Sequence, residues 1–241
     1  MSNQAEQDRI NHVYRQWGAG AGLARQAWHR QESLLQEADQ MRALASLLPV
    51  TVGADLSDVR VIDIGCGHGG FLRQLIDWGA SPACLAGADV QPDRLEHARQ
   101  RTAHGVRWHL GTLDAFPDNS ADLVSAHTVF SALLDDDLRR DMADEMWRVL
   151  RPGGWAMIFD VRYGNPGNRN VRKVTEVELL RFWPTEKRHY RTLILAPPLA
   201  RALTRLPRLV PDILASLLPL LRTHFFYMAQ KEPVEVRRPN Q

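Results

Sequence analysis

The sequence predicts an α/β fold in which a mostly parallel sheet is covered by helices on both faces. Two observations support this prediction. Short apolar segments alternate with helical segments along the chain, and the first apolar segment runs into a glycine-rich loop at residues 65–70. Short buried strands separated by helices indicate right-handed crossovers and a parallel sheet. In such a sheet, ligands bind outside the carboxyl ends of the strands.

The elements follow one another in a regular order. Apolar residues at helical spacing predict helices over residues 7–17 and 23–48, and Pro49 is expected to end the second one. Strands are expected at residues 60–64, 83–88, 106–110, 121–126 and 155–160, with helices at residues 70–78, 92–102 and 137–150. The chain therefore alternates strand and helix from residue 60 to residue 160.

Composition indicates one elaborated domain over residues 1–241. A chain of 241 residues with 44% apolar content can bury one sizeable core. Two cysteines, Cys66 and Cys84, are too few for a disulfide scaffold, and no apolar run approaches the roughly 18 residues of a membrane span. We therefore expect a reduced, cytoplasmic protein with no membrane partner.

Charge is distributed unevenly along the chain. Residues 1–150 carry 14 basic and 21 acidic side chains, whereas residues 151–241 carry 16 and 7. An anionic partner would therefore meet the C-terminal part. A set of solvated arginines is the alternative interpretation.

The glycine loop fits two cofactor fingerprints. Gly65, Gly67 and Gly70 satisfy G-x-G-x-x-G of dinucleotide enzymes, and Asp63 with the glycines at 65, 67 and 69 satisfies D-x-G-x-G-x-G of S-adenosylmethionine enzymes. A pyrophosphate favours a helix N-terminus without negative side chains, whereas a sulfonium zwitterion has an ammonium group that tolerates a carboxylate. Asp63 thus favours the second fingerprint.

Four spaced motifs together resemble those of class I S-adenosylmethionine-dependent methyltransferases. They are Val-Ile-Asp-Ile-Gly-Cys-Gly-His-Gly from residue 61, Gly-Ala-Asp-Val from 87, Asp-Asn-Ser-Ala-Asp-Leu-Val from 118 and Arg-Val-Leu-Arg-Pro-Gly-Gly from 148. The resemblance covers residues 55–162. It implies a three-layer Rossmann-like fold with a mostly parallel seven-stranded sheet, and a cofactor-binding core preceded by an N-terminal helical cap over residues 1–50.

The resemblance also implies the remaining elements. Residues 163–241 would lie on the acceptor side and supply the last two strands, at residues 191–201 and 221–227, with a helical insertion between them. A looser similarity to small bacterial methyltransferases of glycan and natural-product pathways implies a saccharide or another small hydroxylated acceptor.

The family pattern places S-adenosylmethionine against one set of residues. Asp89, about 20 residues after the loop, would accept hydrogen bonds from the ribose hydroxyls, although capping the helix from Pro92 is an alternative role. The full set is Tyr14, Asp63, Gly65, Cys66, Gly67, Asp89, Val90, Thr112, Leu113, Asp114 and His127.

One position departs from the family pattern. Many relatives have an acidic residue directly after the glycine that ends the third strand, where it contacts the adenine amino group, and this chain has Thr112 there. Either the Thr112 hydroxyl replaces the acid or Asp114 reaches back. Leu113 would cover the ring face and present its backbone amide to the purine.

Two residues at strand ends are candidate catalytic groups. Methyl transfer is an in-line displacement, so catalysis is largely positioning, and a base is needed only for a hydroxyl or a protonated amine. His127, at the end of the fourth strand, is the expected base, with a hydrogen-bonded lining role as the alternative. Asp160, at the end of the fifth strand, is a second candidate.

The loop after the fifth strand is rich in turn formers and is the expected acceptor site. Its amides and guanidinium groups can bind hydroxyls and anions, although an ordinary surface loop would have the same composition. The candidate residues are Arg162, Tyr163, Asn165, Asn168 and Arg172.

No metal site is expected, because the acidic triplet at 135–137 suits a helix N-terminus. We expect a small-molecule acceptor and a methyltransferase that acts on oxygen. Nucleic acid is the less favoured partner, because no Asn/Asp-Pro-Pro-aromatic motif follows the fourth strand. A non-catalytic binding module and a homodimer are left open.

Overall fold

The protein forms a single seven-stranded sheet with helices on both faces. The computed structural model describes residues 9, 12–13, 31–164, 167–196 and 219–233. The strand order is β3-β2-β1-β4-β5-β7-β6. All neighbours run parallel except β7, which is antiparallel to both β5 and β6, so the predicted mostly parallel, Rossmann-like fold is confirmed.

The strands agree with the predicted order, and several bounds differ. They are β1 (Val61–Ile64), β2 (Leu85–Asp89), β3 (Arg107–Leu110), β4 (Ala121–His127), β5 (Leu150–Val161), β6 (Arg188–Leu195) and β7 (Arg222–Gln230). β5 starts five residues before the predicted strand, because Leu150 already pairs with Ala121 before an irregular step in the register. The expected strand at 191–201 ends at Leu195, and residues 197–201 lie outside the described part of the chain.

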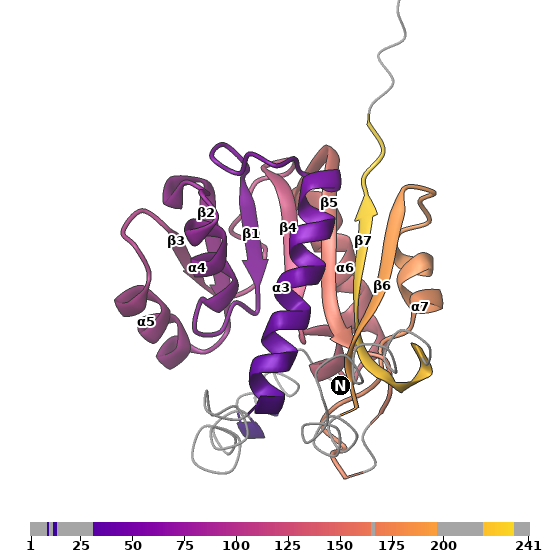
Figure 1. Cartoon of the computed structure of the whole chain (residues 1–241). Coiled ribbons are helices and arrows are strands. Elements are labelled where there is room, and N and C mark those ends of the chain that lie inside the picture. The colour runs from indigo at the N-terminus through magenta and orange to yellow at the C-terminus, as the bar shows by residue number, and fades with distance from the viewer. Residues whose placement is uncertain (1–8, 10–11, 14–30, 165–166, 197–218, 234–241) are drawn as a thin grey trace, which may run out of the picture.

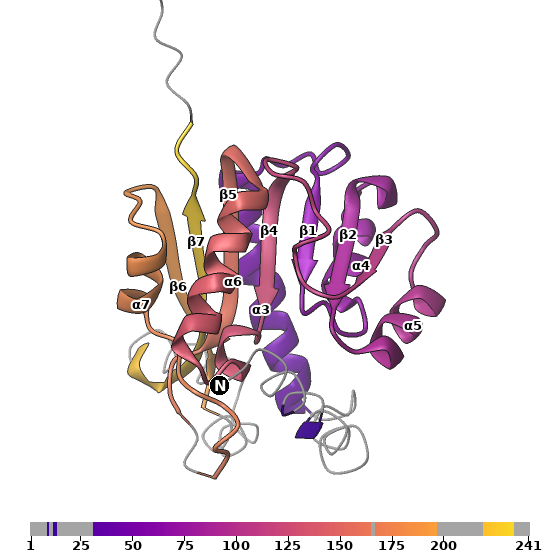
Figure 2. The ribbon, with the colours of Figure 1, turned by 180° about the vertical axis from the view of Figure 1, so that it is seen from behind.

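Helices and short 3-10 turns flank the sheet on both sides. They are α3 (Gln31–Thr51), α4 (Gly70–Asp77), α5 (Pro92–Arg101), α6 (Asp136–Val149) and α7 (Glu176–Phe182), with the short 3-10 turns η1 (Pro82–Cys84), η2 (Phe130–Ala132) and η3 (Pro219–Leu221). Figure 1 shows α3 and α4 in front of the sheet, and Figure 2 shows α6 and α7 on the opposite face. None of the helices in the described ranges is long and apolar enough to cross a membrane.

The prediction that the N-terminal helix ends at Pro49 is wrong. Proline sits inside the last turn of α3, and the helix continues to Thr51. The turn closes because the amides of Val52 and Gly53 both donate to the Leu48 carbonyl, at 2.9 and 3.1 Å. Gly53 takes the left-handed φ of 103° that such a helix end favours.

On the face of the sheet opposite α3, side-chain caps determine where α6 and α7 begin. The Asp135 carboxylate accepts from the amides of Asp137 and Leu138, at 3.0 and 3.3 Å, and so begins α6. Thr175 accepts from the Glu178 amide at 3.2 Å and begins α7, a helix that the sequence did not predict. Caps of this kind stabilise a helix by about 1 kcal/mol.

Two cores form because strand residues alternate between the faces. Ile62, Val124 and Ile158 belong to the core between the sheet and helices α6 and α7. Val61, Leu123 and Met157 belong to the core under α3 and α4. The carboxyl ends of the parallel strands therefore emerge between two packed layers, which hold the loops at that edge in place.

One buried ion pair joins α6 to α7 and to the segment before α7. The Arg139 side chain is fully buried, and its Nη1 donates to both carboxylate oxygens of Glu178 at 2.8 and 3.0 Å. Its other donors reach the carbonyls of Leu133, Lys173 and Arg172. This guanidinium is the main polar link between the core and residues 172–178.

The Arg139→Ala variant should be strongly destabilised. Removing one partner of a buried pair typically costs about 3–5 kcal/mol, because the other charge loses its compensation. We expect the Tm in thermal unfolding to fall by roughly 10 °C.

Arg99→Ala is the matched control. Its ion pair with Glu96 spans 3.8 Å between side chains about half exposed, and pairs of this kind contribute at most about 1 kcal/mol. An equal loss of Tm in both variants would contradict the role given to Arg139.

Candidate functional site

The glycine loop leaves the carboxyl end of β1 in a conformation that glycine favours. Gly65, Gly67 and Gly69 have φ values of 62°, 53° and 72°, a left-handed region that other residues rarely adopt. A Cβ on Gly65 would lie 2.5 Å from Val129 Cγ2, whereas one on Gly67 would meet only an Arg94 nitrogen, at 3.5 Å. The loop thus packs closely against Val129 at Gly65, and the buried Gly67 has only the end of the Arg94 side chain next to its Cβ position.

The loop is held to β2 by two hydrogen bonds. Asp89 Oδ2 accepts from the Gly67 amide at 2.8 Å, and the Cys66 amide donates to the Ala88 carbonyl at 3.1 Å. The side chain of Cys66 is buried, and this burial raises the pKa of its thiol. Backbone and carboxylate together fix where the glycine loop lies.

Asp89 itself does not cap the next helix. Its Oδ1 accepts from the Gln91 amide at 2.9 Å, and Gln91, not Asp89, is the N-cap residue of α5. Each carboxylate oxygen accepts one backbone amide and keeps a second lone pair. Asp89 is itself buried and is followed by the half-buried Val90. Its acceptance of hydrogen bonds from the ribose hydroxyls stays a prediction.

Asp63 lies inside the sheet, one residue before the end of β1. Its Oδ1 accepts from the Ser125 hydroxyl at 2.7 Å, and the two residues face each other in the register of β1 and β4. Burial raises the pKa of Asp63 to about 7, with a smaller contribution from the charge of Asp89. The contact with Ser125 was not foreseen, and the expected role of Asp63 near an ammonium group stays a prediction.

In the segment after β3, Thr112, which stands where many relatives have an acid, is hydrogen-bonded to Asp114. The Thr112 hydroxyl donates to Asp114 Oδ1 at 3.0 Å, and this bond lowers the pKa of the Asp114 carboxyl. Leu113 is completely buried in the core. Its side chain therefore offers no exposed surface to a ring, and a contact through its backbone amide stays a prediction.

His127 ends β4 in aromatic surroundings. Its ring centroid lies 4.5 Å from that of Phe71, 5.8 Å from Phe159 and 6.1 Å from Phe226. Nε2 is buried and has no hydrogen-bond partner within the described residues. Desolvation lowers the pKa of His127 to about 4, so the imidazole is neutral at pH 7.

A second histidine extends this aromatic group and was missed by the sequence analysis. The His224 ring stacks on Phe159 at 5.4 Å, and burial lowers its pKa to about 4 as well. β7 brings it there because His224 pairs with Val161 at the end of β5. A histidine near the start of a predicted strand was visible, but nothing in the sequence indicated that this strand pairs with β5.

Asp160 is buried and hydrogen-bonded to the backbone. It is fully buried, and its carboxylate oxygens accept from the amides of Ser131 at 3.0 Å and Val161 at 2.8 Å. Burial raises its pKa to about 6. The carboxylate anchors η2, the turn that follows β4, and its catalytic role stays a prediction.

The expected acceptor residues are only partly brought together. Tyr163 is exposed and donates to the Leu220 carbonyl at 2.9 Å, and Arg162 donates to the Arg222 carbonyl at 3.0 Å. Asn168 accepts from the Asn170 amide. Tyr14 and Asn165 lie outside the described residues.

Arg172 is tied to the protein instead. Its guanidinium donates to the Leu134 carbonyl at 3.0 Å, pairs with Asp136 and lies 3.3 Å from Glu178. In the described ranges, no group of three or more His, Cys, Asp or Glu side chains is arranged to hold a metal ion.

Part of the chain is similar to known methyltransferases. Residues 61–154 match the methyltransferase domain family. The chain is 33% identical over 144 residues to the biotin biosynthesis bifunctional protein of Cellvibrio japonicus, covering 59% of this chain and 26% of that protein. It is 34% identical over 131 residues to a demethylmenaquinone methyltransferase of Tropheryma whipplei, covering 53% and 50%. The chain thus spans half the length of these relatives or less.

Solved structures show the same fold. Phosphoethanolamine N-methyltransferase 2 of Haemonchus contortus, in complex with S-adenosyl-L-methionine, superimposes with a TM-score of 0.56 at 19% identity. The match covers 79% of this chain and 52% of that one. At this identity the likeness concerns the fold alone.

The Asp63→Asn variant should change how stability depends on pH. A carboxyl with a pKa near 4 when unfolded and about 7 when folded binds an extra proton in the folded state, so its contribution to stability falls as pH rises from 4 to 7. Asparagine removes this slope. The variant's free energy of unfolding, relative to wild type, should therefore increase across that window and level off above it.

Urea denaturation at half-unit pH steps would measure this difference. Subtracting the wild-type curve cancels the titration of His127, His224 and Asp160. Asp93→Asn, at an exposed site on α5, should run parallel to wild type. A parallel curve for Asp63→Asn would show that the carboxylate does not titrate in this range.

Proposed function

We propose that this chain, whose residues 61–154 match the methyltransferase domain family, is a class I S-adenosylmethionine-dependent methyltransferase that transfers a methyl group from S-adenosylmethionine to an oxygen of a small acceptor. The observation that supports this proposal most strongly is the hydrogen bond from the Gly67 amide to Asp89. This bond holds the glycine loop after β1 beside the Asp89 carboxylate at the end of β2. Cofactors bind at such strand ends in this class of sheet.

The residues present fit this cofactor. Asp89 can accept from the two ribose hydroxyls through the lone pairs that Gly67 and Gln91 leave unused. The Gly67 backbone is buried, and only the end of the Arg94 side chain lies near its Cβ position, so movement of that side chain would give the cofactor access to it. Thr112 and Asp114, joined by their hydrogen bond, offer polar atoms for the adenine amino group.

Asp63 would act on the cofactor's ammonium through charge. Burial, with a smaller contribution from the charge of Asp89, raises the pKa of Asp63 to about 7. A cation in the loop would favour the ionised form. Binding would then release a proton from Asp63 near neutral pH.

His127 would take the proton that the acceptor loses. Bound S-adenosylmethionine supplies an activated methyl group, so the protein must place the acceptor oxygen in line and remove one proton. A pKa of about 4 leaves the imidazole unprotonated at pH 7. It is a weak base, but an oxygen that has received a methyl group while it still holds its proton is a far stronger acid than imidazolium. Nε2, which has no partner among the described residues, is the atom that would accept it.

The surroundings of His127 bear on the acceptor. Phe71, Phe159 and Phe226 contact the imidazole, and His224 stacks on Phe159. Phe159 and Phe226 are buried, whereas Phe71 and His224 are half-buried and have surface to offer a ligand. Aromatic faces favour flat, apolar molecular surfaces. Of the two classes indicated by sequence, Phe71 and His224 favour a hydroxylated natural product with an apolar portion over a bare saccharide.

The polar loop gives less support to a saccharide. Arg172 is held by Asp136 and Glu178, and Arg162 by the Arg222 carbonyl. Demethylmenaquinone, named as the acceptor of one relative, agrees with a site that contains the rings of Phe71 and His224.

Asp89→Asn should weaken cofactor binding. Loss of charge-assisted hydrogen bonds to the ribose costs about 1.5–3 kcal/mol, or roughly 10- to 100-fold in Kd. Calorimetric titration with S-adenosylhomocysteine measures this change. Asp93→Asn removes the same charge a few residues away and should bind normally. Binding of NADH in place of the nucleoside would sink the assignment.

His127→Phe should reduce turnover and leave cofactor binding unchanged. Phenylalanine keeps the aromatic packing and removes the base, so we expect a loss of about 10²-fold or more in kcat. The measurement is transfer of a labelled methyl group to the best acceptor from a panel of phenols, quinols and sugars.

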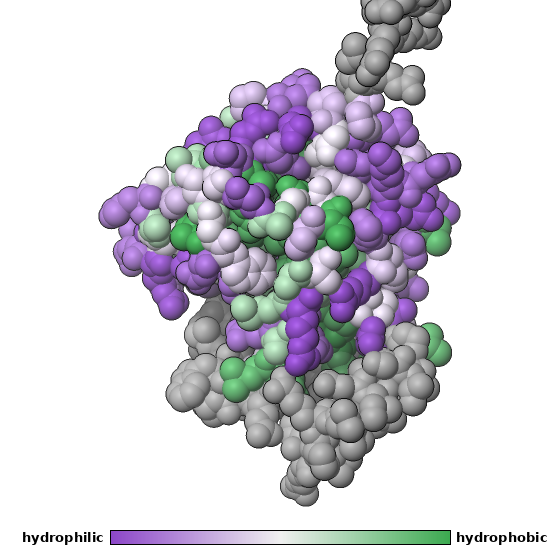
Figure 3. Space-filling view, turned by 45° about the horizontal axis from the view of Figure 1, so that its top comes forward, coloured by the Kyte–Doolittle hydropathy of each residue, from purple (hydrophilic) through white to green (hydrophobic). Residues whose placement is uncertain are grey.

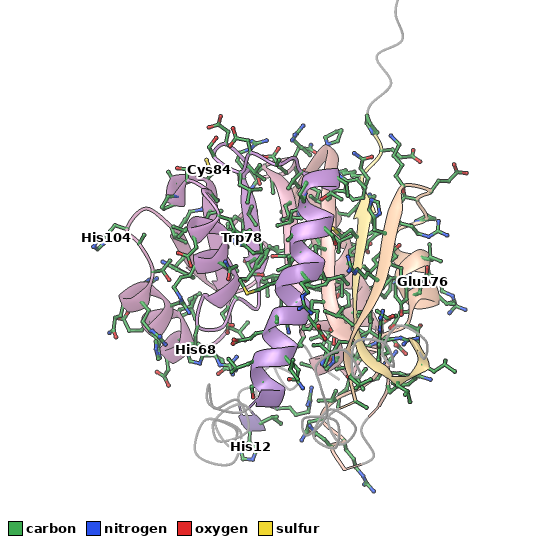
Figure 4. All side chains as sticks on the ribbon, viewed as in Figure 1. His12, His68, Trp78, Cys84, His104 and Glu176 are labelled. Carbon is green, nitrogen blue, oxygen red and sulfur yellow. The ribbon has the colours of Figure 1, made fainter. Side chains whose placement is uncertain are left out.

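His104→Ala serves as the control for this variant. Figure 4 shows His104 projecting from the outer edge of the sheet, far from the glycine loop. A His127→Phe enzyme with wild-type kcat at saturating acceptor would remove the base assignment.

A further inference from the structure

A hollow between α6 and α7 lies on the face of the sheet opposite α3. Its volume is about 460 Å³, within the range of small-molecule sites. Figure 2 shows the two helices side by side on this face. The lining contains none of the residues assigned to the cofactor or to the base, and consists of Asp136, Arg140, Arg172, Lys173, Thr175, Glu178, Arg181 and Phe182.

The two acidic side chains in this lining are already neutralised. Glu178 receives two hydrogen bonds from the buried Arg139 and lies 3.3 Å from Arg172. Asp136 is paired with Arg172 as well. The inner wall is therefore a closed network of ion pairs that holds α6, α7 and the segment before α7 in fixed positions.

Three other cations at the hollow have no acidic partner. Arg140 lies on α6, Lys173 precedes α7 and Arg181 lies in its last turn. All three are exposed, and within the described residues none forms an ion pair within 4.0 Å. Because all three line the hollow, their charges lie around it. Figure 3 shows that hydrophilic side chains also cover much of the described surface on the opposite side, that of α3.

An apolar surface completes the lining. Phe182 is half-buried, and its ring centroid lies 6.2 Å from that of Phe130 in the core. A ligand in the hollow would thus meet positive charge beside one aromatic ring. Guanidinium groups bind phosphate oxygens in pairs, and ammonium adds a point charge.

We propose that this hollow is a second ligand site, which binds a phosphorylated small molecule with its phosphate between Arg140, Lys173 and Arg181 and its apolar part against Phe182. The phosphate supplies the two negative charges that three unpaired cations favour. The site is separate from the glycine loop and does not depend on the proposed methyl transfer.

Phenyl phosphate and inorganic phosphate are suitable probes for calorimetric titration at low salt. We expect phenyl phosphate to bind more tightly than inorganic phosphate, because only the former can use Phe182. Arg140→Glu and Arg181→Glu should each weaken phenyl phosphate at least tenfold. S-adenosylhomocysteine at saturation should leave its Kd unchanged, as should Asp89→Asn.

The matched controls are Arg42→Glu on α3 and Arg99→Glu on α5. Both arginines are about half exposed, and both variants change the net charge by the same amount as the site variants. Equal weakening in site and control variants would show attraction to overall charge and overturn the proposal. Absence of wild-type binding at millimolar phenyl phosphate, or competition with S-adenosylhomocysteine, would overturn it as well.

Two further arms complete the test. Lys173→Glu replaces either arginine variant if that variant has a lowered Tm. Vesicles containing phosphatidic acid test whether the phosphate belongs to a lipid headgroup: retention by vesicles, lost in Arg140→Glu and kept in Arg99→Glu, would assign the same site to a membrane lipid. If vesicles retain wild type and all variants alike, headgroup binding at this site is excluded.

Discussion

The bond between the Gly67 amide and the Asp89 carboxylate is the contact on which the rest of the site depends. It crosses from the loop after β1 to the end of β2. Without it, three left-handed glycines would have little to select one loop conformation, because glycine pays the largest entropic cost of ordering. With it, the Gly67 amide and the Asp89 carboxylate are held together at the ends of neighbouring strands.

Burial at the strand ends shifts the pKa values of several ionisable groups in the direction that favours their uncharged forms. Asp63 and Asp160 have raised pKa values, and His127 and His224 have lowered ones, in each case chiefly through desolvation. Charges that develop during a reaction interact strongly in such an environment, because little water screens them. The energy of a proton transfer at the strand ends would therefore depend strongly on the charges around it.

Much of the sheet could be predicted from sequence because its signals are local. The glycines at 65, 67 and 69, the acid at 89 and the alternation of apolar segments each depend on a few neighbouring residues. Pro49 and α7 were mispredicted or missed because tertiary contacts and a single Thr175 cap decide them. The fixed roles of Asp160 and Arg172 come from partners 29 and 36 residues away, and no local pattern reports such pairings.

The position of β7 has a consequence for how the chain assembles. Within the described residues it is the last strand along the chain, yet it lies between β5 and β6. During synthesis, β5 must therefore wait with an unpaired, largely apolar edge until residues 222–230 have left the ribosome. An edge of this kind invites pairing with other chains. Loss of the final strand would turn a well-packed interior into a surface prone to aggregation, although every residue of the glycine loop would still be present.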